Sequence, residues 1–283
     1  MSFNITWFHK NNFTKDILRQ ETIESLKNNK YHTEEKNFFN ILSYPFSKNS
    51  VSSDSVVNFF ILSFFFFVNK NHTFLINGLG FLEISKKINR RIIFILFFIN
   101  KNKKFLIQNY RDFRFIRRFF KIDKIYWMPG SITNTYIDNK NDNKGIFTIL
   151  RKKKSTNFLK KLNKIRISEV ITIYSLDEIK FNSKNILLKG FKSKEYIFSN
   201  HSKFLYLYCY GDGVPKSLIE SLCNNLEIMI DKKSYLNFGF YKKNLFEIKE
   251  NRQILNLKNL NLQNTREYYN NGLYKIMIDV INI

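Results

Sequence analysis

The sequence has 283 residues, of which 47 are Lys or Arg and 23 are Asp or Glu, so its formal net charge at pH 7 is +24. Because 44% of the residues are hydrophobic and 17% are aromatic, the composition excludes a basic tail or a disordered arm. The chain can bury a core, in one large domain or two small ones. A charge far above what solubility requires indicates a polyanionic partner, a nucleic acid or an anionic membrane face, and we expect nucleic acid.

Composition also bears on origin. The chain has no alanine and only nine Gly, but it has 31 Phe. The scarce residues are those with GC-rich codons, which predicts a strongly AT-biased genome, such as that of an organelle or a reduced endosymbiont. The first 40 residues mix acids with bases, so no import presequence is expected. Cys209 and Cys223 form no CxxC pair and are expected to be buried thiols in a reducing compartment.

The first part of the chain reads as a polar N-terminal extension over residues 1–54, with a helical pattern over 15–27. A helix is predicted over 56–68, where Asp54 and Ser55 can cap it. The apolar runs at 56–68 and 92–99 are shorter than the roughly 18 residues that a membrane-spanning helix needs. We therefore expect them to be buried core elements.

Alternating strands and helices follow. Strands are predicted over 79–83, 104–108 and 122–127, and helices over 85–98 and 111–121. Strands separated by helices of this size predict a doubly wound, mostly parallel α/β sheet of the flavodoxin or Rossmann type, with helices on both faces.

The helix predicted over 111–121 places its cations in one arc and its apolar residues on the other side. Such a cationic face can be an ordinary solvated surface. Since Asp112 is the only acid in this helix, we favour contact with a phosphate backbone. The cations of this arc are Arg111, Arg114, Arg117, Arg118 and Lys121.

The segment Tyr126-Trp127-Met128-Pro129-Gly130 cannot continue a strand or a helix and predicts an ordered loop that ends near Thr133 and Asn134. Trp127 can stack on an exposed base or fill the core beneath the loop, and both readings stay open. Residues 135–200 are expected to form a basic insertion after this loop, with a cationic helix or arm over 151–166.

A complete βαβ unit is predicted next, with a strand at 204–210, a helix that starts near Pro215, and a strand at 227–231. The expected units are therefore the extension 1–54, the first half of the α/β core at 55–134, the insertion 135–200, and the second half with a C-terminal helix at 201–283.

No assembled catalytic constellation is recognised in the sequence. The Gly78-Leu79-Gly80 segment lacks the third glycine of a dinucleotide fingerprint, because Glu83 occupies that place. The four His residues are far apart and lack metal-ligand spacing. Asp212, between two glycines, can be catalytic but is favoured as a turn former at a helix start. We expect no cofactor, no metal and no enzyme activity.

Three stretches carry a resemblance to a known family. Asn77 to Lys86 follows the pattern Asn-Gly, apolar strand, acidic residue and helix start; Trp127, Gly130, Thr133 and Asn134 lie on a Trp-x-Gly-Gly-x-Leu-Thr-Asn loop; and Glu220, Asn224, Asn225 and Leu226 match a Glu-Ala-Asn-Asn-Leu helix end. In this order and spacing, over roughly residues 56–245, the chain resembles the small-subunit ribosomal protein two family, as a divergent mitochondrial or organellar member. Pro129 replaces the first loop glycine of that family.

The resemblance implies a non-enzymatic structural constituent of the small ribosomal subunit, with ribosomal RNA and neighbouring ribosomal proteins as partners and no small-molecule substrate. It implies an organelle-encoded protein of the mitochondrial ribosome, with a plastid or the cytoplasm of a reduced endosymbiont as alternatives. A nucleic-acid-processing enzyme on a doubly wound fold is the alternative function. The residues expected to contact RNA are Arg111, Arg114, Arg117, Arg118, Lys121, Lys124, Tyr126, Trp127, Thr133, Asn134, Arg151, Lys152, Lys153, Lys154, Lys160 and Lys161.

Overall fold

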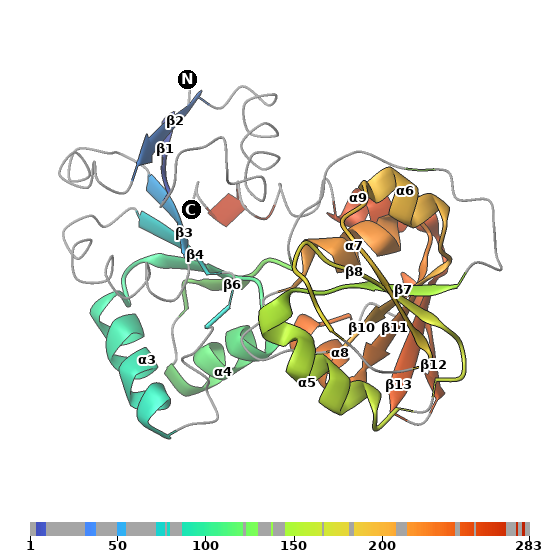
Figure 1. Ribbon diagram of the computed structural model, residues 1–283. Helices are drawn as coiled ribbons and strands as arrows, with labels where there is room; N and C mark the ends of the chain where they lie inside the picture. Colours follow the sequence, from blue (N-terminus) through green and yellow to red (C-terminus); the bar gives the residue numbers. More distant parts are fainter. Residues whose placement is uncertain are drawn as a thin grey trace.

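A computed structural model of the protein has one parallel sheet and one mostly parallel sheet, each flanked by helices (Figure 1). The structure describes residues 4–9, 32–37, 50–54, 72–76, 78–79, 87–120, 123–129, 137, 145–165, 167–180, 184–207, 214–240, 244–251, 253–269, 276 and 279–280.

The first sheet has six strands in the order β2-β1-β3-β4-β5-β6, and every neighbouring pair is parallel. Its central strands β4 and β5 are buried on both faces, as apolar parallel strands covered by helices should be. The bounds are β1 (Asn4–His9), β2 (His32–Asn37), β3 (Ser50–Asp54), β4 (His72–Ile76), β5 (Lys104–Ile107) and β6 (Ile125–Trp127).

Helices α3 (Lys87–Ile99) and α4 (Tyr110–Phe120) pack on one face of this sheet. Their side chains share a buried cluster with Phe74 and Phe105 of the strands beneath them. The side chain of Asn109 caps α4, because its Oδ1 accepts the N–H groups of Arg111 and Asp112 at 3.1 and 3.2 Å.

The second sheet has seven strands in the order β12-β13-β11-β10-β7-β8-β9. The strands from β7 to β11 run parallel, and β12 and β13 form an antiparallel hairpin at the β11 edge. The bounds are β7 (Ile146–Ile149), β8 (Ile171–Tyr174), β9 (Ile186–Lys189), β10 (Lys203–Tyr206), β11 (Glu227–Asp231), β12 (Phe246–Asn251) and β13 (Ile254–Asn259).

Helices cover both faces of the second sheet. Phe158 and Leu162 of α5 (Lys152–Leu162) pack with Ile146 and Leu205 on one face. On the other face, Leu218 of α7 lies in a buried cluster with Phe204 of β10 and Ile228 of β11. The remaining bounds are α6 (Lys194–Ser199), α7 (Lys216–Cys223), α8 (Lys232–Phe238) and α9 (Leu262–Glu267).

The carboxyl edges of the two sheets adjoin at Gly239, among other contacts. Gly239 ends α8, which follows the carboxyl end of β11, and it lies against the side chains of Tyr110 and Trp127. Tyr110 follows β5 and Trp127 ends β6, and their ring centroids lie 4.8 Å apart. Gly239 has φ +74°, and a Cβ built on it would lie 2.8 Å from the Trp127 ring, so the joint leaves no room for a side chain.

The predicted fold class is confirmed as mixed α/β with parallel sheets and helices on both sides. The structure differs from the sequence reading in having two sheets. Residues 146–199, expected as an insertion, supply β7, β8 and β9 of the second sheet, and residues 4–54 supply three strands of the first. The βαβ unit is confirmed as β10, α7 and β11, with Pro215 at the N-cap of the helix.

Some predicted elements differ in detail. The strand expected over 79–83 is not observed at Leu79, and the strand that precedes α3 is β4, at His72–Ile76. The predicted helices at 15–27 and 56–68, and Cys209, lie outside the described residues. Cys223 is buried as expected, and burial raises the pKa of its thiol to about 12. In the part of the chain that is described, no helix is long and apolar enough to cross a bilayer.

Candidate functional site

The second sheet changes direction between β7 and β10. From β7 the chain moves outward through β8 to β9, and it then returns to the other side of β7 to form β10 and β11. The loops that follow β7 and β10 therefore diverge to opposite faces, one to α5 and the other to α7. Open α/β sheets bind ligands in the crevice outside the carboxyl ends of such a strand pair.

The loop after β7 is cationic. Arg151 is exposed and occupies the N-cap position of α5, and no side chain caps this helix. The first turn of α5 contains Lys152, Lys153 and Lys154 and no acid. Uncapped N–H groups and the positive end of the helix dipole favour a bound anion, and the neighbouring cations strengthen that preference.

Two further lysines come from the loops on the other side. Lys194 begins α6, which follows β9, and Lys216 begins α7, which follows β10. Both pair with the buried carboxylate of Glu220, at 2.6 Å from Lys194 and 3.8 Å from Lys216. Since one carboxylate faces two ammonium groups, the cluster keeps a net positive charge at the crevice.

A pocket of about 310 Å³ lies beside this cluster, where β8 and β9 end. Leu176 and Phe191 line it with exposed apolar surface. Asp177 and Glu178 line it with carboxylates, and the Ser175 hydroxyl accepts the Asp177 N–H at 3.0 Å, which holds the turn. Apolar walls with a few oriented acceptors suit a flat heterocycle that carries N–H donors.

The first sheet contributes one carboxyl group at its carboxyl edge. Asp112, in the first turn of α4, accepts the N–H of Leu79 at 3.3 Å and so joins the loop after β4 to this helix. Burial raises the pKa of Asp112 to about 6, against the opposing effects of the Leu79 hydrogen bond and Arg111. A carboxyl group with such a pKa can exchange a proton near neutral pH.

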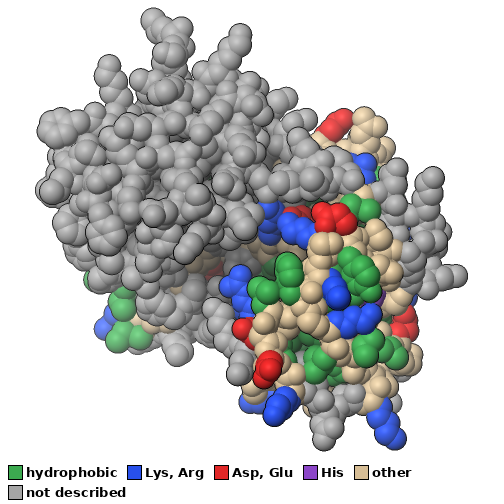
Figure 2. All heavy atoms as spheres, turned by 45° about the horizontal axis from the view of Figure 1, so that its top comes forward, with side chains coloured by type: hydrophobic (Ala, Val, Ile, Leu, Met, Phe, Trp, Pro, Cys, Tyr) green, Lys and Arg blue, Asp and Glu red, His purple; other side chains and the backbone are tan. Residues whose placement is uncertain are grey.

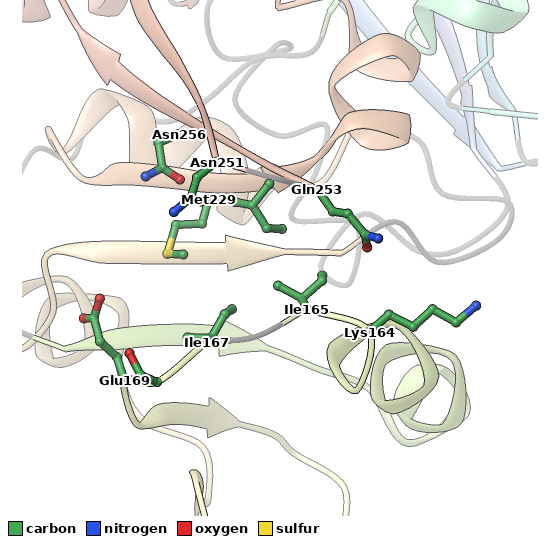
Figure 3. A pocket seen from close by; sticks show the side chains of 10 residues that line it. Lys164, Ile165, Ile167, Glu169, Met229, Asn251, Gln253 and Asn256 are labelled. Atoms are coloured by element: carbon green, nitrogen blue, oxygen red, sulfur yellow. The ribbon is translucent and has the colours of Figure 1, made fainter.

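A second pocket, of about 240 Å³, opens on the α5 face of the sheet, between the end of α5 and the β12–β13 hairpin (Figure 3). Its lining mixes Ile165 and Met229 with polar residues such as Asn256. Its only carboxylate, Glu169, pairs with Lys203 at 3.0 Å, at the amino ends of β8 and β10. The pocket is therefore remote from the crevice where parallel sheets bind ligands.

The residues predicted from the sequence are dispersed over the molecule. Arg114, Arg117 and Arg118 are exposed on α4, while Arg111 is half-buried beside Asp112. Lys160 is exposed near the end of α5, and Lys161 pairs with Asp231 at 3.0 Å. Lys121, Thr133 and Asn134 lie outside the described residues, and Lys152 and Lys153 are placed on α5 by their backbone alone.

Trp127 is placed as a packing residue. Its Nε1 donates to the Gln108 carbonyl oxygen at 3.2 Å, and its ring packs against Tyr110 and Gly239. Tyr126 is half-buried and packs against the same core cluster as the second sheet, and Lys124 lies on the surface. None of the contacts assigned to RNA is tested at the level of single residues, and those assignments stay predictions.

Of the predicted residues, the structure brings Arg151 and Lys154 to the crevice. Sequence reasoning missed Lys194, Lys216 and Glu220, and it used Asp112 only as the acid of a cationic helix. The available signal was the Gly-Asp-Gly turn at 211–213 with Pro215 after a buried strand, which indicates a ligand loop that opens a helix. Among the described residues, no cluster of His, Cys, Asp and Glu is arranged to hold a metal ion.

No protein-family model matches the chain, and no curated protein matches it. Solved structures of similar architecture include the S. aureus TarM G117R mutant with fondaparinux, alpha-GlcNAc-glycerol and UDP, at 15% identity and a TM-score of 0.48 over 83% of this chain. The chain spans 50% of the length of that protein. With TM-scores below 0.5, function has to be argued from the side chains of this protein.

Two others are the spinosyn forosaminyltransferase SpnP, with 8% identity and a TM-score of 0.44 over 81% of this chain and 79% of that one, and the glycosyltransferase SnogD from Streptomyces nogalater. SnogD has 6% identity and a TM-score of 0.39, over 100% of this chain and 94% of its own.

These findings correct the expected identity. The resemblance to small-subunit ribosomal protein two is wrong: no family model supports it, the matched structures include transferases, and Trp127 ends a strand of the first sheet whereas Glu220 belongs to α7 on the second. The expected non-enzymatic role in translation, the ribosomal RNA and protein partners, and the absence of a small-molecule substrate are wrong with it. The nucleic-acid-processing enzyme is not supported either. The expected mitochondrial location, with a plastid or a reduced endosymbiont as alternatives, is not tested and stays a prediction.

Proposed function

We propose that the protein is a glycosyltransferase that binds a nucleoside diphosphate sugar at the carboxyl edge of its second sheet. The observation that carries this proposal is that cations begin the helices after three parallel strands of the second sheet, and that two of them, Lys194 and Lys216, pair with the same carboxylate of Glu220. Arg151 and Lys154 approach from the loop after β7, and Lys194 and Lys216 approach from the loops after β9 and β10. A diphosphate is the ligand whose charge and size suit such a cluster.

The neighbouring pocket gives the proposal its second half. The nucleobase would occupy the space between Leu176 and Phe191, where Asp177 and Glu178 can accept its N–H groups. The diphosphate would then extend toward the start of α5. Glu220 holds the two lysines in place and offers a carboxylate to the hydroxyl groups of a sugar.

The cations also have a role in the reaction. An acceptor hydroxyl oxygen forms a bond to the anomeric carbon, the bond from that carbon to the diphosphate oxygen breaks, and the nucleoside diphosphate leaves with the electron pair. Arg151, Lys194 and Lys216 stabilise the negative charge that develops on the leaving group. Asp112, at the adjoining edge of the first sheet, is our candidate to accept the proton of the acceptor hydroxyl, because of its pKa of about 6.

Binding of nucleoside diphosphates tests this proposal. We expect UDP, ADP or GDP to raise the thermal midpoint of the full chain, and Lys216→Ala to weaken binding about tenfold, the loss of one charge-assisted contact. Lys249→Ala is the matched control, since this lysine is exposed on the β12–β13 hairpin, where it pairs with Glu247 at 3.2 Å. Isothermal titration measures both affinities. Equal affinity of the two variants would show that the crevice is not the diphosphate site.

Turnover separates binding from catalysis. The assay uses the nucleoside diphosphate sugar whose nucleobase gives the tightest binding. Release of the nucleoside diphosphate measures the rate of donor hydrolysis or of sugar transfer. We expect Asp112→Asn to lower kcat about a hundredfold while leaving the donor KM within a few fold, the pattern of a lost general base. A variant that keeps its kcat would remove Asp112 from the mechanism but leave the donor site intact.

A further inference from the structure

The outward face of α3 is apolar. Ile88, Ile95 and Phe98 expose 67%, 52% and 58% of their surface, and Phe94 and Ile99 are exposed beside them. Phe94, Ile95, Phe98 and Ile99 recur every three or four residues, and Ile88 lies about two turns before them with Arg91 between, so these residues share one side of the 13-residue helix. The rings of Phe94 and Phe98 stack at 5.8 Å.

The opposite face of α3 is also apolar. Ile93, Leu96 and Phe97 are buried against the first sheet, which fixes the orientation of the helix. The exposed stripe is therefore not the side of α3 that packs in the core. A helix that is apolar all round is normally buried on every side. Here one side stays exposed among the residues that the structure describes, and an exposed apolar patch of this kind marks an interaction surface.

Cations surround the stripe. Arg90 and Arg91 are exposed on α3, and the Lys101 ammonium lies 5.3 Å from the Phe98 ring centroid. The neighbouring α4 adds exposed Arg117 and Arg118, together with exposed Phe119. Figure 2 shows hydrophobic and basic side chains adjoining at the lower left, where Figure 1 places α3. No acid occurs in α3, and the one acid of α4, Asp112, is bonded to Leu79.

We propose that this face, formed by α3 and the adjoining end of α4, seats the protein on an anionic lipid surface. Exposed aliphatic and aromatic side chains insert between acyl chains, and the surrounding arginines and lysines pair with the headgroup phosphates. The helix is too short to span a bilayer and lies in the plane of the interface.

Other occupants fit this face less well. A second copy of the chain would bring two sets of the same cations together across a two-fold axis, where like charges repel. A nucleic acid backbone would pair with the arginines but would leave the isoleucines in contact with water and phosphate. Charge complementarity together with the aliphatic stripe favours lipid. This inference is independent of the proposed transferase activity.

Flotation of the full chain with vesicles tests it. We expect the chain to float with vesicles of phosphatidylcholine and phosphatidylglycerol and to stay behind with phosphatidylcholine alone. Ile95→Ser with Phe98→Ser is expected to lower the bound fraction about tenfold, and Arg90→Glu with Arg91→Glu by a similar factor. The matched control is Val170→Ser with Leu260→Ser, which removes exposed apolar residues of the second unit and is expected to leave binding unchanged.

The outcomes distinguish the occupants. Thermal unfolding of each variant confirms that it is folded, and nucleoside diphosphate affinity is expected to be the same in all of them. Vesicle binding that survives Ile95→Ser with Phe98→Ser would overturn the proposal. So would a wild-type chain that binds double-stranded RNA and no vesicles, or one that sediments as a dimer and becomes monomeric in the same double variant.

Discussion

Lys103 lies just before β5, and its side chain is only 3% exposed. Its Nζ has no hydrogen-bond partner and lies 5.8 Å from the Phe74 ring centroid. Burial lowers the pKa of this amine from 10.5 to about 8. An ammonium group that is buried without a carboxylate costs free energy, and only part of that cost is offset by the aromatic ring.

The consequence for stability has a definite sign. Between pH 8 and 10.5 the unfolded chain binds the proton that the folded chain has lost, so the stability contributed by Lys103 rises with pH in this window. Below pH 8 both states are charged, and the folded state bears the full cost of burial. We expect Lys103→Met to stabilise the protein at pH 7 by about 2–3 kcal/mol.

Urea unfolding of wild type and Lys103→Met at pH 7 and again near pH 10 measures this effect. The difference should shrink at the higher pH, while Lys101→Met, which removes an exposed lysine, should change the midpoint little at either pH. A Lys103→Met midpoint at or below that of the wild type would show that the amine has a partner in solution.

At the scale of elements, the amphipathic helix α4 and the βαβ unit could be predicted, whereas β4 and the strands β7, β8 and β9 were missed. The helix predicted at 111–121 is α4 at 110–120, because its cationic and apolar faces have a clear helical period. Strand β4 was missed because it begins with His72, a residue that apolar patterns skip. Its ring is fully buried between Ser50 Oγ at 2.9 Å and Ser52 Oγ at 2.8 Å, both on β3. Both ring nitrogens of His72 find their hydrogen-bond partners on another strand, so no local sequence pattern reveals that this His is buried.

His72 is therefore expected to stabilise the pairing of β3 with β4. Burial lowers the pKa of His72 well below its usual value, so the ring is neutral and can accept from one serine while it donates to the other. We expect His72→Ala to cost about 2–4 kcal/mol, since it removes the hydrogen bonds of the ring to two buried hydroxyl groups and opens a cavity. Guanidinium unfolding measures the loss, and Ser168→Ala, at an exposed serine, serves as the control. A loss below that of the control would contradict this role.

At the scale of the whole molecule, the sequence predicted parallel α/β architecture but not its division into two sheets. Each βαβ unit has the same local pattern, and the partner of a strand is decided by side chains far away along the chain. Trp127 was recognised as unusual, yet its role depends on Gly239, which is more than a hundred residues away in the sequence. Lys194 and Lys216 come from two separate loops, and only the folded sheet shows that they meet at Glu220.

The joint at Gly239 provides a test at this scale. We expect Gly239→Ala to destabilise the protein by about 2–4 kcal/mol, because the new methyl group meets Trp127 and Tyr110 and the residue has a positive φ. Gly190→Ala is the control, since a Cβ there meets nothing within 4 Å. Thermal unfolding measures both, and two separate transitions in Gly239→Ala would show that the contact couples the sheets. Equal thermal midpoints of Gly239→Ala and Gly190→Ala would mean that the contact at Gly239 does not stabilise the association of the two units.

The chain crosses between the two units more than once. It passes from β6 to β7 after Met128, and beyond α9 it returns, because Val280 is buried in one continuous cluster with Leu75 and Leu106 of the first sheet (Figure 1). The same cluster contains Leu218 and Ile228 of the second unit, so pulling the two sheets apart would expose apolar surface of both to water.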